Sequence, residues 1–170
     1  FDNLLNQKFT VDCKNKVWCT DFTYMRQPNG KFRYNCSIID LYDRSAVASL
    51  NSDCINTDLA INTLKTALKK EKHPKVILHS DQGVQFTSCE FVNFCKDNNI
   101  TQSMSKAGCP YDNAPVERFY NTFKSNFYNV TSFSNVEVMD ELTTKYINWY
   151  NYVRPHSHNN YLTPMEARYK

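Results

Sequence analysis

The sequence predicts a mixed α/β fold in which a five-stranded mixed sheet is flanked by helices, and three observations support this prediction. Segments rich in β-branched and aromatic residues lie at 16–25 and 31–40, and 45–51 could add a third antiparallel strand. Apolar residues then recur at helical spacing over 57–70. Further strand-like segments at 75–81 and 100–105 alternate with helical ones. This order predicts an antiparallel meander, followed by a crossover helix that adds parallel pairing.

The elements of the first half follow from turn and spacing signals. The sequence PNG at 28–30 is a turn signal, so the first two strands should form a hairpin. The helix at 57–70 carries Ile61, Leu64 and Leu68 on one face. The segment KVILHSD at 75–81 has the composition of a buried strand with a charged group at its C-terminal tip.

The second half is predicted to be mainly helical. Thr87 and Glu90 match a capping box, which predicts a helix that begins there. The region 110–115 should lead into a long helix with several Phe residues on one side, and 136–152 forms a further helix. Asp112 and Asn113 are expected to shape the start of the long helix.

The amino-acid composition excludes some classes of protein. Apolar residues make up 41% of the chain, enough for a core, and only three glycines are present, so a Gly-rich phosphate loop is excluded. The net charge of +3 does not by itself establish a nucleic-acid partner. Seven cysteines without C-x-x-C spacing predict reduced, mostly buried thiols in a cytosolic protein. Residues 1–14 are expected to be a linker from a missing N-terminal DNA-binding region.

Three acidic residues are candidate catalytic groups, although each has an ordinary explanation when taken alone. Asp21 lies inside an apolar strand, where backbone donors could satisfy a buried carboxylate. Asp81 ends a strand, at the kind of position where ligands gather in α/β folds, yet Asp is also common in turns. Glu117 is near a helix start, where a glutamate interacts favourably with the helix dipole.

Taken together, the three acids suggest a metal site. Two like charges at about 4 Å repel by roughly 4 kcal/mol at an effective dielectric constant of 20, so folding would not gather them without a cation. Carboxylates without nearby cysteines favour Mg²⁺ or Mn²⁺ over zinc. Two such ions about 3.5–4 Å apart suit phosphoryl transfer.

The helix around Glu117 has a polar stripe that should face away from the core. Its members follow helical spacing and share one side of the predicted helix, opposite the Phe residues; they are Asn113, Glu117, Asn121, Lys124 and Tyr128. We therefore expect this carboxylate to point toward a ligand, with a lysine two turns further along.

Four motifs in order resemble a known family. TDFTY at 20–24, HSDQGVQFTS at 79–88, DNAPVERFYNTFK at 112–124 and the tail WYNYVRPHSHNNYLTPMEA at 149–167 are similar to the integrase core of the IS-three family of bacterial insertion-sequence transposases, within the retroviral-integrase superfamily. Asp81 and Glu117 are separated by 35 residues, which is the spacing of that family's second and third acids. The resemblance runs from about residue 15 to 169.

The resemblance implies a ribonuclease H-like fold and a DNA transposase or integrase. It implies that Asp21, Asp81 and Glu117 are catalytic metal ligands, with two Mg²⁺ or Mn²⁺ ions when DNA is bound. It further suggests DNA contacts from the long helix, through Lys124, Asn113, Asn121 and Arg118. The expected partners are double-stranded DNA, as transposon ends and target, and further copies of the chain in a synaptic complex. The expected location is the bacterial cytoplasm, at the nucleoid.

Residues beside the acids are expected to shape the site. They are His79, Gln82 and Gly83, although a packed strand histidine is the more ordinary role for the first of them. Asp40 and Asp43 are expected to be turn residues or salt-bridge partners of Arg44.

Other functions remain as alternatives. A nuclease on the same fold, such as a ribonuclease H or a resolvase, would use the same acids without strand transfer. A non-catalytic domesticated core would bind DNA alone, although the intact acids argue against it. Tyrosine recombination requires an Arg/His cluster around a nucleophile, and Arg154, Pro155 and His156 imitate it poorly.

Overall fold

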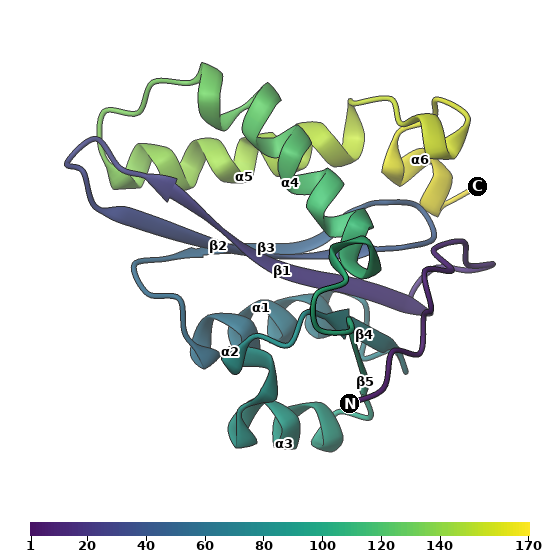
Figure 1. Ribbon diagram of the computed structural model, residues 1–170. Helices are drawn as coiled ribbons and strands as arrows, with labels where there is room; N and C mark the ends of the chain where they lie inside the picture. Colours follow the sequence, from purple (N-terminus) through teal and green to yellow (C-terminus); the bar gives the residue numbers. More distant parts are fainter.

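The sheet has the strand order β3-β2-β1-β4-β5 in the computed structural model, which describes residues 1–170 apart from the side chain of Pro110 (Figure 1). The strands are β1 (Val17–Arg26), β2 (Phe32–Asp40), β3 (Ala46–Ser52), β4 (Ile77–Ser80) and β5 (Thr101–Met104). β2 pairs antiparallel with β1 and β3, whereas β4 pairs parallel with β1 and β5. The predicted five-stranded mixed sheet is confirmed.

The helices fall close to their predicted positions. They are α1 (Thr57–Lys70), α2 (Val84–Thr87), α3 (Cys89–Asp97), α4 (Ala114–Asn126), α5 (Val136–Tyr152) and α6 (Pro164–Arg168). Short 3₁₀ turns are η1 (Pro110–Asn113), η2 (Tyr128–Val130) and η3 (Ser157–Asn159). The helices expected at 57–70 and 136–152 are confirmed.

The predicted capping box at Thr87 is wrong by one residue. Thr87 ends the one-turn helix α2, and its hydroxyl donates back to the Gly83 carbonyl at 3.3 Å. Ser88 instead caps α3, because its Oγ accepts from the backbone N–H of Phe91 at 3.2 Å. The chain therefore forms a separate turn of helix, α2, between the loop after Asp81 and the start of α3.

Helices cover both faces of the sheet, and alternation along β1 divides the core between them (Figure 1). Cys19 and Met25 pack in the cluster that contains α4 and α5 residues. Trp18, which is fully buried, packs in the cluster built with α1 and α3. Full burial of one large apolar side chain stabilises the fold by about 1.5–3 kcal/mol, so both layers hold the sheet firmly.

Asp40 and Asp43 do not pair with Arg44 as expected. Both carboxylates are fully buried and form ion pairs with Arg168 of α6, which also pairs with Glu71. The two aspartates also accept turn N–H groups, so the turn part of the expectation is confirmed. Because α6 delivers the guanidinium to β2, this network ties the C-terminal tail to the sheet.

The N-terminal segment packs against the domain. Leu5 is buried in the α4 and α5 cluster, and the Asp2 carbonyl accepts from the backbone N–H of Met104. Asp112 accepts from the side chains of Asn3 and Gln7 and from a backbone N–H, so it anchors this segment. Asp112 thus organises the loop before α4 and makes no capping bond to the helix.

The expectation of mostly buried thiols is only partly right. Cys19, Cys36 and Cys95 are buried and behave as small apolar side chains. The other thiols are exposed or partly exposed; they are Cys13, Cys54, Cys89 and Cys109. All seven are free of disulfides.

Candidate active site

Asp21 and Asp81 are brought together by the register of two parallel strands. The last pair that joins β1 to β4 is Cys19 with His79, and each aspartate lies two residues further along its chain. Asp81 therefore stands at the carboxyl end of β4, where open α/β sheets bind ligands, and Asp21 lies beside it where the β1–β4 pairing ends. Asp21 remains inside β1, whereas Asp81 has already left β4.

Glu117 joins them because α4 is fixed across β1. The hydroxyl of Tyr120 donates to the backbone carbonyl of Asp21 at 2.8 Å and is also within 3.2 Å of the Asn35 side-chain oxygen. Glu117 lies three residues earlier, on the same side of the helix. All three acids line one cavity of about 340 Å³, which we call the acid cavity.

The electrostatics of this cavity disfavour charge on Asp21. Burial, followed by the charges of Asp81 and Glu117, raises the pKa of Asp21 to about 7, against a lowering effect from the N–H of Phe22. That N–H donates to Asp21 Oδ1 at 2.7 Å. The three carboxylates therefore interact, and a cation between them would relieve their repulsion.

The carboxylate oxygens in this cavity are the type of ligand that a hard divalent cation prefers. Their present arrangement does not form a complete coordination site. Among the described residues, no group of three or more His, Cys, Asp or Glu side chains stands ready to hold a metal ion. Asp21 and Asp81 each accept a local backbone N–H through Oδ1, which leaves Oδ2 of each carboxylate for an ion. Asn113 supports a polar ligand, because its buried amide lines the cavity and neither its oxygen nor its nitrogen has a partner.

The residues expected to shape the site divide into two groups. Gln82 lines the cavity and donates to the Ser105 carbonyl at 3.0 Å. Gly83 donates its N–H to Asp81 Oδ1 at 2.9 Å. His79 is fully buried between the hydroxyls of Ser103 and Ser105, and burial lowers its pKa, so it packs behind the cavity.

The predicted polar stripe on α4 is partly wrong. Asn113 precedes α4 in the 3₁₀ turn η1 and is buried, because this turn directs it into the cavity. Asn121 is exposed. The Nζ of Lys124 lies 4.8 Å from the centroid of the Tyr24 ring. Tyr128 lies beyond the helix, and its hydroxyl donates a hydrogen bond to a backbone carbonyl of β1. Of this stripe, Asn113 and Glu117 line the acid cavity.

Sequence reasoning missed the loop that follows β5. Lys106, Gly108 and Cys109 line the same cavity as the three acids. A signal was available, since a strand parallel to β4 must end at the same edge of the sheet. Lys106 is exposed and supplies a positive charge next to the acids.

Replacing Gly83 with Ala is expected to disturb Asp81 without unfolding the chain. An added Cβ would lie 2.9 Å from Asp81 Oδ1 and 3.2 Å from the side-chain oxygen of Gln85. The backbone φ of −57° suits alanine, so the carboxylate moves and the fold stays. We expect Mn²⁺ affinity to fall about 10-fold, as when the support of a metal ligand is disturbed, with an unchanged melting temperature. Wild-type Mn²⁺ affinity would show that the position of Asp81 does not depend on this contact.

Comparison with known proteins places the chain in a family. A family described as "Integrase core domain" matches residues 11–110, more than half of the chain, and a second family with that description matches residues 98–164. The chain belongs to the integrase core domain family. The two matched segments together contain Asp21, Asp81 and Glu117.

Curated proteins similar to this chain include bacterial transposases. Transposase InsF for insertion sequence IS3A of Escherichia coli strain K12 is 35% identical over 171 residues, which cover 99% of this chain and 59% of InsF. InsF for IS3fB from the same strain is 36% identical over 165 residues, covering 96% of this chain and 57% of that protein. The chain thus spans less than two thirds of the length of these transposases.

Solved integrase cores have the same fold. The HTLV-2 integrase catalytic core domain in complex with magnesium, in its trimeric form, matches with a TM-score of 0.70 at 16% identity, over 92% of this chain and 97% of that one. A chain of the simian T-cell lymphotropic virus intasome in complex with PP2A regulatory subunit B56 gamma matches with a TM-score of 0.76 at 18% identity, over 93% of this chain and 55% of that one. The predicted ribonuclease H-like fold is confirmed. In the described residues, no helix is both long and apolar enough to span a membrane.

Proposed function

We propose that this chain is the catalytic core of a DNA transposase that cuts and rejoins phosphodiester bonds. The observation that carries the proposal is that Asp21, Asp81 and Glu117 line one and the same cavity. The charges of Asp81 and Glu117 there raise the pKa of Asp21. The names of the related transposases support the same conclusion. In the proposed reaction, water first attacks the phosphate at the end of the element and frees a 3′-OH, which then attacks a second phosphate.

Asp21, Asp81 and Glu117 would hold Mg²⁺ or Mn²⁺, two ions when DNA is bound. Such ions activate the attacking oxygen and stabilise the leaving oxygen. The chain's own groups position the site: Gly83 orients Asp81 through its N–H, and Tyr120 holds α4 against β1. Asn113 has a free donor and a free acceptor for a phosphate oxygen or a water molecule.

The partners and location belong to the same proposal. The DNA is double-stranded, as element ends and target, with Lys124, Asn113, Asn121 and Arg118 as contacts. Copies of the chain associate in a synaptic complex at the bacterial nucleoid. Residues 15–170 form the catalytic core with its helical C-terminal extension, and the segment before them packs against this core.

A strand-transfer assay on labelled oligonucleotides tests the reaction. We expect joined products with Mg²⁺ or Mn²⁺, none with a chelator, and binding without turnover with Ca²⁺. Cleavage without joining would favour the alternative of a nuclease on this fold. DNA binding without any cleavage would favour the non-catalytic alternative, and equal activity in the chelator would overturn the metal mechanism.

Metal binding can be measured without reference to activity. Mn²⁺ is expected to raise the melting temperature of the wild-type chain, because an ion that binds only the folded state stabilises it. The effect should be small without DNA, since substrate phosphates supply some of the ligands. The Asp81→Asn variant should lose the shift, and an equal shift in this variant would place the ion elsewhere.

A further inference from the structure

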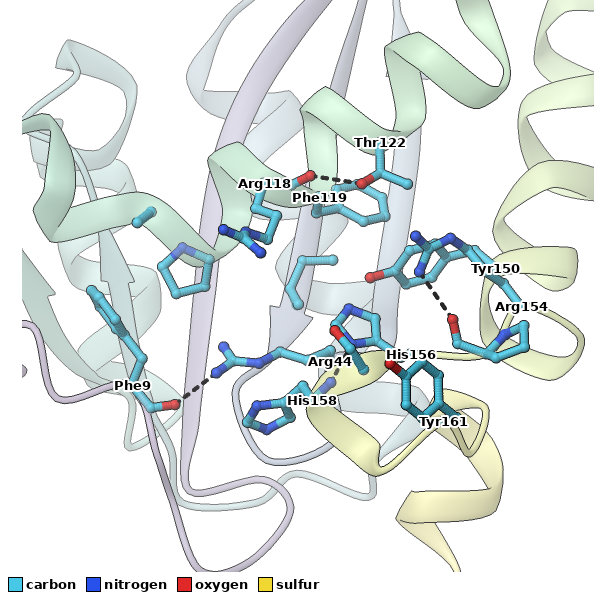
Figure 2. Close-up of a pocket in the computed structure, with 15 residues that line it drawn as sticks. Phe9, Arg44, Arg118, Phe119, Thr122, Tyr150, Arg154, His156, His158 and Tyr161 are labelled. Atoms are coloured by element: carbon cyan, nitrogen blue, oxygen red, sulfur yellow. Dashed lines mark hydrogen bonds between the residues drawn. The ribbon is translucent and has the colours of Figure 1, made fainter.

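A second and larger cavity lies on the other side of the start of α4. Its volume is about 730 Å³, and its walls come from α4, the end of α5, the C-terminal tail and the turn between β2 and β3 (Figure 2). Ala114, Pro115 and Arg118 face this cavity, whereas Asn113 and Glu117 face the acid cavity. The first turn of α4 therefore separates the two cavities.

The walls of this cavity carry an excess of positive charge. Three arginines and two histidines line it, and no described lining residue is acidic; the five are Arg44, Arg118, Arg154, His156 and His158. Within the described part of the chain, none of the three arginines takes part in an ion pair. The nearby carboxylates of Asp40 and Asp43 are already bound to Arg168.

Arg44 has a donor that lacks an acceptor. Its Nη2 donates to the Phe9 carbonyl at 2.9 Å, whereas its Nη1 is buried and unpartnered (Figure 2). A buried guanidinium N–H without an acceptor is costly, and an oxygen anion in the cavity would satisfy it. The conformation is also constrained, since the backbone φ of Arg44 is +62°.

His156 lies within the same positive field. Burial, followed by the charges of Arg154, His158, Arg44 and Arg118, lowers the pKa of His156 to about 4. Groups on the tail, on α4 and on the β2–β3 turn thus all act on this ring with the same sign. A bound anion would offset them and raise the pKa of His156.

Aromatic rings stand beside the cations. Phe119 and Tyr150 pack edge to face with ring centroids 5.1 Å apart, and Arg154 lies 5.6 Å from the Tyr150 centroid (Figure 2). Tyr161 adds an exposed ring on the tail. Phe119 and Tyr150 are buried, so the guanidinium groups suit a phosphate while the exposed Tyr161 ring is the one open to a sugar or base.

We propose that this cavity binds a backbone phosphate of the DNA strand that continues from the acid cavity around the first turn of α4. The inference rests on the proposed function, since it takes the scissile phosphate to lie at the acids. It gives a role to the RPH segment at 154–156, which the proposed chemistry does not use. Arg118 directly follows Glu117 in α4, so its side chain leaves the helix about 100° further around the axis. One DNA strand that passes around this turn of the helix can therefore contact both cavities.

The test compares DNA binding by an Arg118→Gln/Arg154→Gln variant with that of the wild-type chain, using a short duplex in Ca²⁺ at two salt concentrations. We expect about 10-fold weaker binding and a shallower salt dependence, because each lost phosphate contact lowers the slope by roughly one. Arg26→Gln/Lys31→Gln is the control, since it removes the same two charges at the exposed hairpin and should change binding less than 2-fold. Equal binding by the Arg118→Gln/Arg154→Gln variant and the control would overturn the inference.

Nuclear magnetic resonance of His156 gives a second readout that does not need turnover. The duplex is expected to raise its pKa in the wild-type chain and in Asp81→Asn, which separates this cavity from the catalytic one. A shift with inorganic phosphate but none with DNA would assign the cavity to a free phosphate and overturn the DNA assignment. Duplex binding with the His156 shift but without strand transfer would overturn the proposed function and leave this inference standing.

Discussion

Replacing Asp21 with Asn, Asp81 with Asn or Glu117 with Gln is expected to lower DNA cleavage at least about 100-fold while the fold stays intact. Loss of an outer-shell partner of a metal ligand alone costs about 10–100-fold, and these residues are proposed to be the ligands themselves. Each substitution removes a charge and almost no volume. Cleavage rates in Mg²⁺, measured on a labelled duplex, check the expectation for each acid.

The matched control is Glu137→Gln, because Glu137 is exposed in the first turn of α5, as Glu117 is in α4. This variant should cleave like the wild type. Without metal, Asp21→Asn should also raise the melting temperature, since burial and the neighbouring acids already disfavour the charged form. More than a tenth of wild-type cleavage in any of the three acid variants would remove that residue from the site.

Replacing Arg168 with Met is expected to destabilise the domain by about 3–5 kcal/mol, the usual cost of leaving buried charges without their partner. Arg168 meets Asp40 and Asp43, both fully buried, and Glu71. Burial and the adjacent Asp43 charge already raise the pKa of Asp40, so removing the guanidinium leaves these carboxylates without their counter-charge. Urea denaturation at neutral pH measures the loss.

Lys145→Ala serves as the control for this experiment. Lys145 pairs with Glu141 on the surface of α5, where both side chains are largely exposed, and its removal should leave stability nearly unchanged. In the Arg168→Met background, a further Asp43→Asn substitution should recover part of the loss, because it removes one unpaired charge. A loss no larger than that of Lys145→Ala would show that the network does not hold the tail.

Much of the fold was predictable because its signals are local. The helices at 57–70 and 136–152 and the three antiparallel strands follow from residue spacing and composition over short windows. The start of α3 was misplaced because two adjacent hydroxyl residues compete for the capping position, and only the bond from Thr87 back to Gly83 decides between them. The partner of Asp40 and Asp43 was also misassigned, because the true partner lies more than 120 residues away.

The candidate site, like the fold, was predictable from the sequence only in part. The identity of the three acids and the 35-residue spacing could be read from the chain alone. The sequence did not indicate that Asn113 is turned inward, since a 3₁₀ turn interrupts the helical period just before α4. Nor did it indicate the second cavity, whose arginines come from three separate segments.

By itself, the sequence determined which residues can bind a hard cation, which segments form strands and helices, and which family the chain resembles. Tertiary structure alone decided which of these residues meet. The β1–β4 register sets Asp21 beside Asp81, the Tyr120 bond brings Glu117 to them, and α6 delivers Arg168 to two buried carboxylates. The physical reason is that propensity and periodicity act over a few residues, whereas strand register and long-range hydrogen bonds are fixed when the whole chain packs.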